Sequence, residues 1–153
     1  MKALLDTNVL LRAAQPSLPL AADVRDSLSA LVAAGVRLCL VPQNLYEFWV
    51  VATRPVNLNG FGLDTKSATR LAEECLQNFT LLKDERGIFA TWFDLVDRHA
   101  VVGKLAHDAR LVAAMQRHSL VNLVTFNKSD FSRFPLISTF SPQDILSGIL
   151  PVT

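Results

Sequence analysis

The stretch MKALLDTNVLL at residues 1–11 places an aspartate directly after the only apolar run near the N-terminus. Ala3, Leu4 and Leu5 predict a short buried strand, and Asp6 stands where that strand would end. A carboxylate in this position either caps the following helix or points into a functional site. The rest of the sequence is needed to choose between these two interpretations.

Short strands alternate with helices along the rest of the chain. Such a pattern is typical of a parallel sheet that is covered on both faces. The sequence therefore predicts one α/β domain over residues 1–153, a three-layer α/β/α sandwich with a mostly parallel central sheet. Strands are expected at 2–5, 36–41, 79–82, 121–125 and near 136–138, helices at 7–14, 20–34, 43–53, 65–78, 86–99, 107–118 and from Pro142, and a loop at 54–64.

The composition limits the classes of protein to which the chain can belong. With 153 residues, of which half are apolar, the chain can bury its own core. No apolar stretch approaches the ~20 residues of a membrane span, and Asp6 and Asn8 interrupt any signal-peptide pattern. We therefore expect a cytoplasmic protein without a membrane partner, whose excess apolar surface contacts a subunit or partner. Cys39 and Cys75 lack metal-ligand spacing and are expected to be buried thiols.

Four acidic residues lie close to the edge at which the predicted strands end: Asp6, Glu47, Asp108 and Asp130. Ligand sites of open α/β sheets gather at the carboxyl ends of the strands, so these side chains are expected to share one site. Clustered carboxylates repel one another unless a cation neutralises them, and Mg²⁺ prefers oxygen ligands. The pattern predicts metal-assisted hydrolysis of a phosphodiester. The three histidines are too scattered to form a zinc site.

Each of these acidic residues also has a purely structural interpretation. Asp6 can cap the helix that follows it, and Glu47 can form an ion pair with Arg54 or another cation. Asp108 can interact favourably with the dipole of its helix, and Asp130 can be an ordinary turn residue. Each structural role is plausible for one residue. It is less expected that all four acids have only structural roles and still gather at one edge of the sheet by coincidence.

Four segments, in this order and spacing, resemble the PIN-domain ribonucleases: MKALLDTNVLL, QNLYEFW at 43–49, HDARLVAAM at 107–115 and TFNKSDFSRF at 125–134. The resemblance runs from Lys2 to about Ile145, and the compact length is similar to that of VapC-type toxins of bacterial toxin–antitoxin pairs. It implies an endoribonuclease that depends on Mg²⁺ or Mn²⁺, is inhibited by a cognate antitoxin protein and forms a homodimer.

Carried over by position, the resemblance implies that the catalytic and metal-binding residues are Asp6, Glu47, Asp108 and Asp130. Many members of the family have an aspartate two residues after the threonine, where this chain has Asn127. Either Asp130 or Asn127 can fill this fourth position, and the site can hold one ion or two. Asn8 and Thr125 match polar positions that organise the family's site through hydrogen bonds.

The basic residues do not decide where RNA would bind. The net charge of +1 argues neither for nor against a polyanionic partner, although arginine, which suits bidentate phosphate contacts, predominates among the basic residues. The basic residues that flank the acidic segments are candidates for contacts with RNA phosphates, with ordinary surface charge as the alternative. These candidates are Arg12, Lys104, Arg110 and Lys128.

Three other classes of protein share parts of this pattern. A haloacid dehalogenase-type phosphatase needs a second aspartate two residues after the first, where this chain has Asn8. A response-regulator receiver needs an acidic pair near its start, which is missing here. A catalytically inactive PIN-like scaffold that binds RNA or protein stays as the alternative, because Asn127 departs from the family pattern. The retained carboxylates Asp6, Glu47 and Asp108 argue against it.

Overall fold

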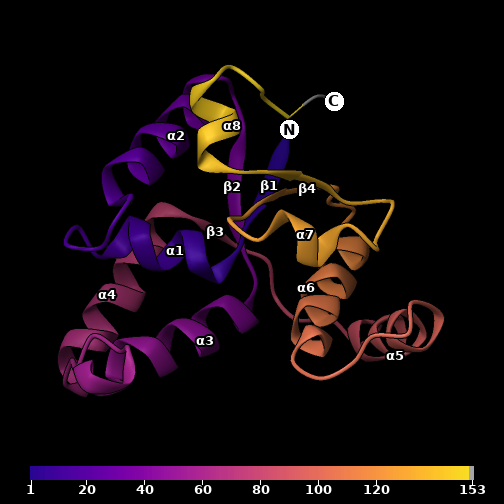
Figure 1. The fold of residues 1–153 in the computed structure, drawn as a ribbon, viewed down its shortest axis with the longest axis horizontal. Helices are drawn as coiled ribbons and strands as arrows, with labels where there is room; N and C mark the ends of the chain where they lie inside the picture. The colour runs from indigo at the N-terminus through magenta and orange to yellow at the C-terminus, as the bar shows by residue number, and fades with distance from the viewer. Residues whose placement is uncertain (152–153) are drawn as a thin grey trace.

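Five parallel strands form the centre of the computed structural model, which describes residues 1–151 (Figure 1). Their order across the sheet is β3-β2-β1-β4-β5, and each neighbouring pair is parallel. The predicted parallel sheet is therefore confirmed. The strands are β1 (Lys2–Leu5), β2 (Arg37–Leu40), β3 (Thr80–Leu81), β4 (Asn122–Val124) and β5 (Ser138–Phe140).

Helices cover both faces of the sheet, which confirms the three-layer arrangement (Figure 1). One buried cluster, which contains Ala3 and Leu5, is covered by α1 (Thr7–Ala14), α2 (Ala21–Ala33), α3 (Pro42–Thr53), α4 (Thr65–Asn78) and α8 (Pro142–Leu146). The other cluster, which contains Leu4, is covered by α5 (Ile88–Arg98), α6 (Leu105–Arg117) and α7 (Lys128–Phe131). Successive side chains of a strand face opposite sides, so β1 contributes to both clusters.

Local signals in the sequence start and end several of these helices. Asp64 is the N-cap of α4, and its carboxylate accepts a hydrogen bond from the backbone N–H of Ser67 at 2.7 Å. Pro42 is the first residue of α3, where a backbone N–H would have no partner within the helix. Gly35 follows α2 with φ of +79°, a left-handed conformation that glycine adopts without strain and that turns the chain toward β2.

The last strand and the loop after α3 differ from the sequence prediction. The strand expected near 136–138 begins at Ser138, because the backbone N–H of Ile137 still donates to the carbonyl of Phe134 in a turn. The predicted loop at 54–64 contains a short 3-10 helix, Val56–Leu58.

Two further boundaries concern acidic residues. Helix α6 begins at Leu105 rather than at residue 107, so that Asp108 lies in its first turn instead of at its start. Asp130 lies within the short helix α7, so the structural interpretation of this residue as an ordinary turn residue is wrong. The neighbouring Phe131 is buried in the core, which anchors α7 against the sheet.

The order of the strands reverses between β1 and β4. From β1 the chain passes outward to β2 and β3, and it then returns to β4 and β5 on the other side of β1. The two strands end together, because the backbone N–H of Asp6 donates to the carbonyl of Val124 at 2.9 Å. Reversal points of this kind form the ligand-binding crevices of open α/β sheets.

Both cysteines lie in the core of the protein. Cys39 and Cys75 are free and buried, as predicted, and burial raises the pKa of the Cys75 thiol to about 11. Within residues 1–151, none of the helices is both long enough and apolar enough to cross a membrane.

Candidate functional site

Asp6 lies at the end of β1 and uses its two carboxylate oxygens differently. Oδ1 accepts a hydrogen bond from the backbone N–H of Thr7 at 2.7 Å and so caps α1. Oδ2 accepts from Thr125 Oγ1 at 2.6 Å and from Asn8 Nδ2 at 2.9 Å, at the reversal point of the sheet. Asp6 thus both caps a helix and takes part in a buried polar cluster.

The pKa of Asp6 is the result of opposing influences. Burial raises it, since the residue is only 9% exposed, and the charge of Glu47 raises it further. The hydrogen bonds from Thr125, Thr7 and Asn8 favour the ionised form and act against this increase. The net result is a raised pKa for a carboxylate that accepts three hydrogen bonds.

Glu47 reaches the same place from α3. Its Oε2 accepts from Thr7 Oγ1 at 2.7 Å, and its Oε1 accepts from Gln43 Nε2 at 2.9 Å. The alternative of an ion pair with Arg54 or another cation is wrong for the part of the chain that the structure describes, because the donors to Glu47 there are these two neutral side chains. Neutral donors orient the carboxylate without cancelling its charge.

Asp108 and Asp130 approach from α6 and α7, on the opposite face of the sheet. Burial and the charges of Asp6, Asp130 and Glu47 together raise the pKa of Asp108 to about 6, against a small opposing effect of His107. Asp6, Glu47 and Asp130 therefore all lie close enough to Asp108 to act on it electrostatically. Within residues 1–151, neither the Asp108 nor the Asp130 carboxylate accepts a hydrogen bond.

The three predicted supporting residues lie around Asp6. Asn8 donates to Asp6, and its Oδ1 accepts from the backbone N–H of Phe126 at 3.4 Å. Thr125 is fully buried, and its Oγ1 also accepts from the backbone N–H of Asn127 at 3.0 Å. Asn127 therefore contributes a backbone group to the cluster, while its side chain is exposed.

Three buried polar residues of the site are missed by the sequence prediction: Thr7, which donates to Glu47, and the amides Asn44 and Gln43. Asn44 Nδ2 donates to the carbonyl of Leu5 at 3.0 Å and to Thr7 Oγ1 at 3.3 Å, which ties α3 to the end of β1. Gln43 contacts Glu47 and α6. Two adjacent amides directly after a buried strand and a proline are a signal that could have identified Gln43 and Asn44.

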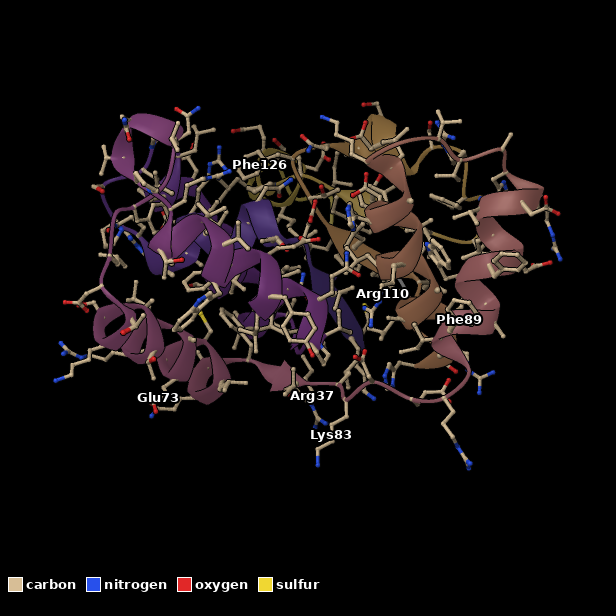
Figure 2. All side chains as sticks on the ribbon, turned by 90° about the horizontal axis from the view of Figure 1, so that it is seen from below. Arg37, Glu73, Lys83, Phe89, Arg110 and Phe126 are labelled. Carbon is tan, nitrogen blue, oxygen red and sulfur yellow. The ribbon has the colours of Figure 1, made fainter. Side chains whose placement is uncertain are left out.

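Three of the four basic candidates are engaged in contacts within the protein. Arg12 donates to the carbonyl oxygen of Asn8 at 2.8 Å, and its guanidinium lies over the ring of Phe126. Arg110, on the side of α6 that faces α3 in Figure 2, donates to Asp84 and to Gln43.

The other two basic candidates are lysines, and they differ in whether the side chain is paired with an acidic residue. Lys128 forms an ion pair with Asp144 at 2.7 Å, and this contact lowers the pKa of Asp144. Lys104 is exposed and forms no side-chain hydrogen bond or ion pair with any residue from 1 to 151. Of the four candidates, Lys104 is thus the one with an uncommitted charge.

The type and the arrangement of the donor atoms show whether these residues suit a divalent cation. No three His, Cys, Asp or Glu side chains within residues 1–151 converge into a complete metal site. The chemistry nevertheless suits a hard cation, because all four acids offer carboxylate oxygens, and burial together with the charges of the other three raises the pKa of Asp108. Mg²⁺ typically keeps several waters and uses only one or two carboxylates, so full convergence is not required.

The chain belongs to the PIN domain family, because a family model of the PIN domain matches residues 3–136. Solved structures with the same fold include VapBC2 from Rickettsia felis bound to a promoter DNA fragment (TM-score 0.70, 14% identity, 92% of this chain and 98% of that chain). VapBC-1 from nontypeable Haemophilus influenzae is similarly related (TM-score 0.68, 16% identity, 94% and 99%).

A third solved structure carries a description of its activity. It is VapC20 from Mycobacterium tuberculosis, described as a toxin that cleaves the sarcin–ricin loop (TM-score 0.59, 14% identity, 79% of this chain and 86% of that chain). At these identities the likeness establishes a shared fold. No curated protein matches this chain.

Proposed function

We propose that this chain is a metal-dependent endoribonuclease that hydrolyses RNA phosphodiester bonds, and that it is the toxin of a toxin–antitoxin pair. The observation that carries the proposal is the meeting of Asp6, Glu47, Asp108 and Asp130 at the reversal point of the sheet, where burial and the charges of the other three acids raise the pKa of Asp108 to about 6. Membership of the PIN domain family supports the same conclusion. An acidic cluster of this kind serves phosphate chemistry when a divalent ion joins it.

The residues that would hold Mg²⁺ or Mn²⁺ are Asp6, Glu47, Asp108 and Asp130, with Asn127 as the alternative in the fourth position. When bound, the ion supplies an activated water and stabilises the charge that develops on the RNA phosphate. The protein's part is orientation: Thr125 and Asn8 hold one oxygen of Asp6, and Thr7 holds one oxygen of Glu47. Such outer partners normally set the direction of a ligand.

RNA would be bound by the basic residues that flank the acidic cluster. Lys104 is the first of the candidates, since its charge is uncommitted within residues 1–151. Arg12, Arg110 and Lys128 would have to share or exchange their present partners to contact a phosphate.

We further propose a cytoplasmic protein that forms a homodimer and binds an antitoxin. Four solved structures with this fold are described as VapBC or toxin–antitoxin complexes, two of them bound to DNA. Exposed aromatic side chains support a partner surface. Phe89, on α5 in Figure 2, is 69% exposed, and Tyr46 and Phe93 are exposed as well.

A catalytically inactive PIN-like scaffold that binds RNA or protein is the second candidate. It is favoured by the lack of a preassembled set of three ligands within residues 1–151 and by Asn127 in place of an aspartate. The two candidates differ in their dependence on metal.

The test is the cleavage of a total RNA preparation by the purified protein and its Asp6→Asn variant, with Mg²⁺, with Mn²⁺ and with EDTA. Asparagine keeps the capping ability of this position, so the variant should fold. Asp26→Asn, at an exposed position of α2, is the matched control. We expect discrete fragments that require metal, persist in the control and disappear in Asp6→Asn. Fragments that survive Asp6→Asn would overturn the assignment of the site.

No cleavage by any of the three proteins would favour the scaffold, and calorimetric titration with Mn²⁺ then decides. A scaffold without a metal site should show no binding, whereas a nuclease of narrow RNA specificity should bind Mn²⁺ and lose that binding in Asp6→Asn.

A further inference from the structure

The acidic cluster is assembled from two helices that lie in different layers. Glu47 is on α3, which packs against α1 and α4 on one face of the sheet, and Asp108 is on α6, which packs against α5 and α7 on the other. In Figure 1 the first turns of α3 and α6 lie on either side of the same end of the sheet. The spacing of these two carboxylates therefore depends on what joins the helices at this edge.

The side-chain hydrogen bonds between α3 and α6, within residues 1–151, all involve Gln43. Its Nε2 donates to the carbonyl of His107 at 2.8 Å and to Glu47 Oε1 at 2.9 Å. Its Oε1 accepts from Arg110 at 3.2 Å. Gln43 is only 7% exposed, and each of these three hydrogen bonds is partly buried.

Arg110 acts together with Glu47 and the His107 carbonyl to set which way the amide of Gln43 faces. A guanidinium is a donor only, so it must face the amide oxygen, and the amide nitrogen is then directed at Glu47 and at the His107 carbonyl. Asp84 holds Arg110 in turn, at 3.2 Å. The contacts form a chain from Asp84 through Arg110 and Gln43 to Glu47.

We propose that Gln43 is a positioning residue that fixes the spacing of Glu47 and Asp108 across the edge of the sheet, with Arg110 as the residue that orients it. The carbonyl that Gln43 holds belongs to His107, the residue before Asp108, so the contact places the first turn of α6 directly. The part of this proposal that concerns the metal ion rests on the proposed function. The joining of the two helices does not.

The test compares Gln43→Met, which keeps the length and removes the hydrogen bonds, with Gln77→Met at an exposed position of α4 as the matched control. The first measurement is hydrogen–deuterium exchange of the metal-free proteins at the amides of residues 109–112. We expect exchange there to become about 10-fold faster in Gln43→Met, the factor that one lost hydrogen bond represents. Exchange in α2 should not change.

The second measurement is the Mn²⁺ dissociation constant by calorimetry, which we expect to rise about 10–100-fold in Gln43→Met. Arg110→Met, at a half-exposed position, is the variant to use if Gln43→Met does not fold, and it should act in the same direction with a smaller effect. Because the two residues act through one chain, Gln43→Met with Arg110→Met should be no worse than Gln43→Met alone.

The outcomes separate this proposal from the proposed function. Unchanged exchange at residues 109–112, or effects of the two substitutions that simply add, would overturn the positioning role. If the unaltered protein binds no Mn²⁺, the proposed metal site fails, and the exchange measurement alone then decides whether Gln43 joins the helices. Faster exchange with unchanged Mn²⁺ affinity would reject the effect on the ion and keep the joining of α3 to α6.

Discussion

The two halves of the acidic cluster are held in different ways. On the side of β1 and α3, Asp6 accepts three hydrogen bonds and Glu47 accepts two, all from backbone or neutral side-chain groups. On the side of α6 and α7, Asp108 and Asp130 accept none from residues 1–151, and the pKa of Asp108 rises to about 6.

This difference indicates that the two halves have different roles. Hydrogen bonds orient Asp6 and Glu47 in advance, whereas Asp108 and Asp130 need a cation to neutralise their charge. Neutral donors fix the direction of Asp6 and Glu47 but leave their negative charge in place. The charge then acts on Asp108, which has no donor of its own to favour the ionised form. A cation that binds between the halves would relieve that repulsion, so the first half would orient the ion and the second would gain most from its arrival.

The largest expected effect comes from removing a hydrogen bond in the half that contains Asp6 and Glu47, by a substitution at Thr125. The Thr125→Val substitution keeps the shape of the side chain and removes the 2.6 Å hydrogen bond to Asp6 inside the core, together with the 3.0 Å hydrogen bond from the Asn127 backbone N–H. Loss of a buried hydrogen bond to a charged group should lower the free energy of unfolding by about 2 kcal/mol, measured by urea denaturation. Metal-dependent cleavage should fall about 10–100-fold.

The control for this substitution is Thr139→Val on β5, whose hydroxyl forms no hydrogen bond within residues 1–151. A loss of stability as large in Thr139→Val as in Thr125→Val would mean that the strand, and not the contact with Asp6, is sensitive to the change.

A smaller effect of opposite sign is expected at Asp108. Its pKa is raised from 3.8 to about 6, so the folded protein binds this proton more tightly than the unfolded chain does. The resulting stability is present below about pH 4 and is lost as the pH rises through about 6. The difference is at most roughly 3 kcal/mol, which partial exposure reduces to about 1–2 kcal/mol.

Without metal, Asp108→Asn should therefore raise the free energy of unfolding by about 1–2 kcal/mol at pH 8 and leave it nearly unchanged at pH 4. Added Mn²⁺ should reverse the order, since saturation about 100-fold above the dissociation constant stabilises the unaltered protein by about 2.7 kcal/mol. Asp97→Asn, at an exposed position of α5, is the control. If Asp108→Asn were less stable than the unaltered protein at pH 8 without metal, Asp108 would not be the carboxylate that burial and neighbouring charges destabilise.

The smallest effect is expected from the lysines that flank the second half. Lys104→Met should reduce the slope of log affinity against log salt for a labelled single-stranded RNA by about 0.7, the value for one phosphate contact. Binding is measured by fluorescence polarisation in EDTA, so that cleavage does not interfere. Lys128→Met should change the slope less, because Lys128 is paired with Asp144, and should alter stability by under about 1 kcal/mol. The reverse order would show that Lys128 leaves Asp144 to bind RNA.

The sequence by itself determined the layers and the edge at which the acids gather. Buried strands separated by helices have a periodicity that follows from local backbone geometry, so Asp6 after β1 and Thr125 after β4 could be placed from the pattern alone. The same reasoning failed at Lys128–Phe131, where a helix of four residues is too short to show a helical period and depends on the burial of Phe131.

Only the tertiary structure decided which side chains pair across the site. Gln43 meets His107 and Arg110, and Lys128 meets Asp144, because folding brings together segments that are far apart along the chain. A sequence pattern records the spacing of residues within one element but not the register between elements in different layers. For that reason the acids could be predicted as a group, whereas the hydrogen bonds that hold one half of them and leave the other half free could not.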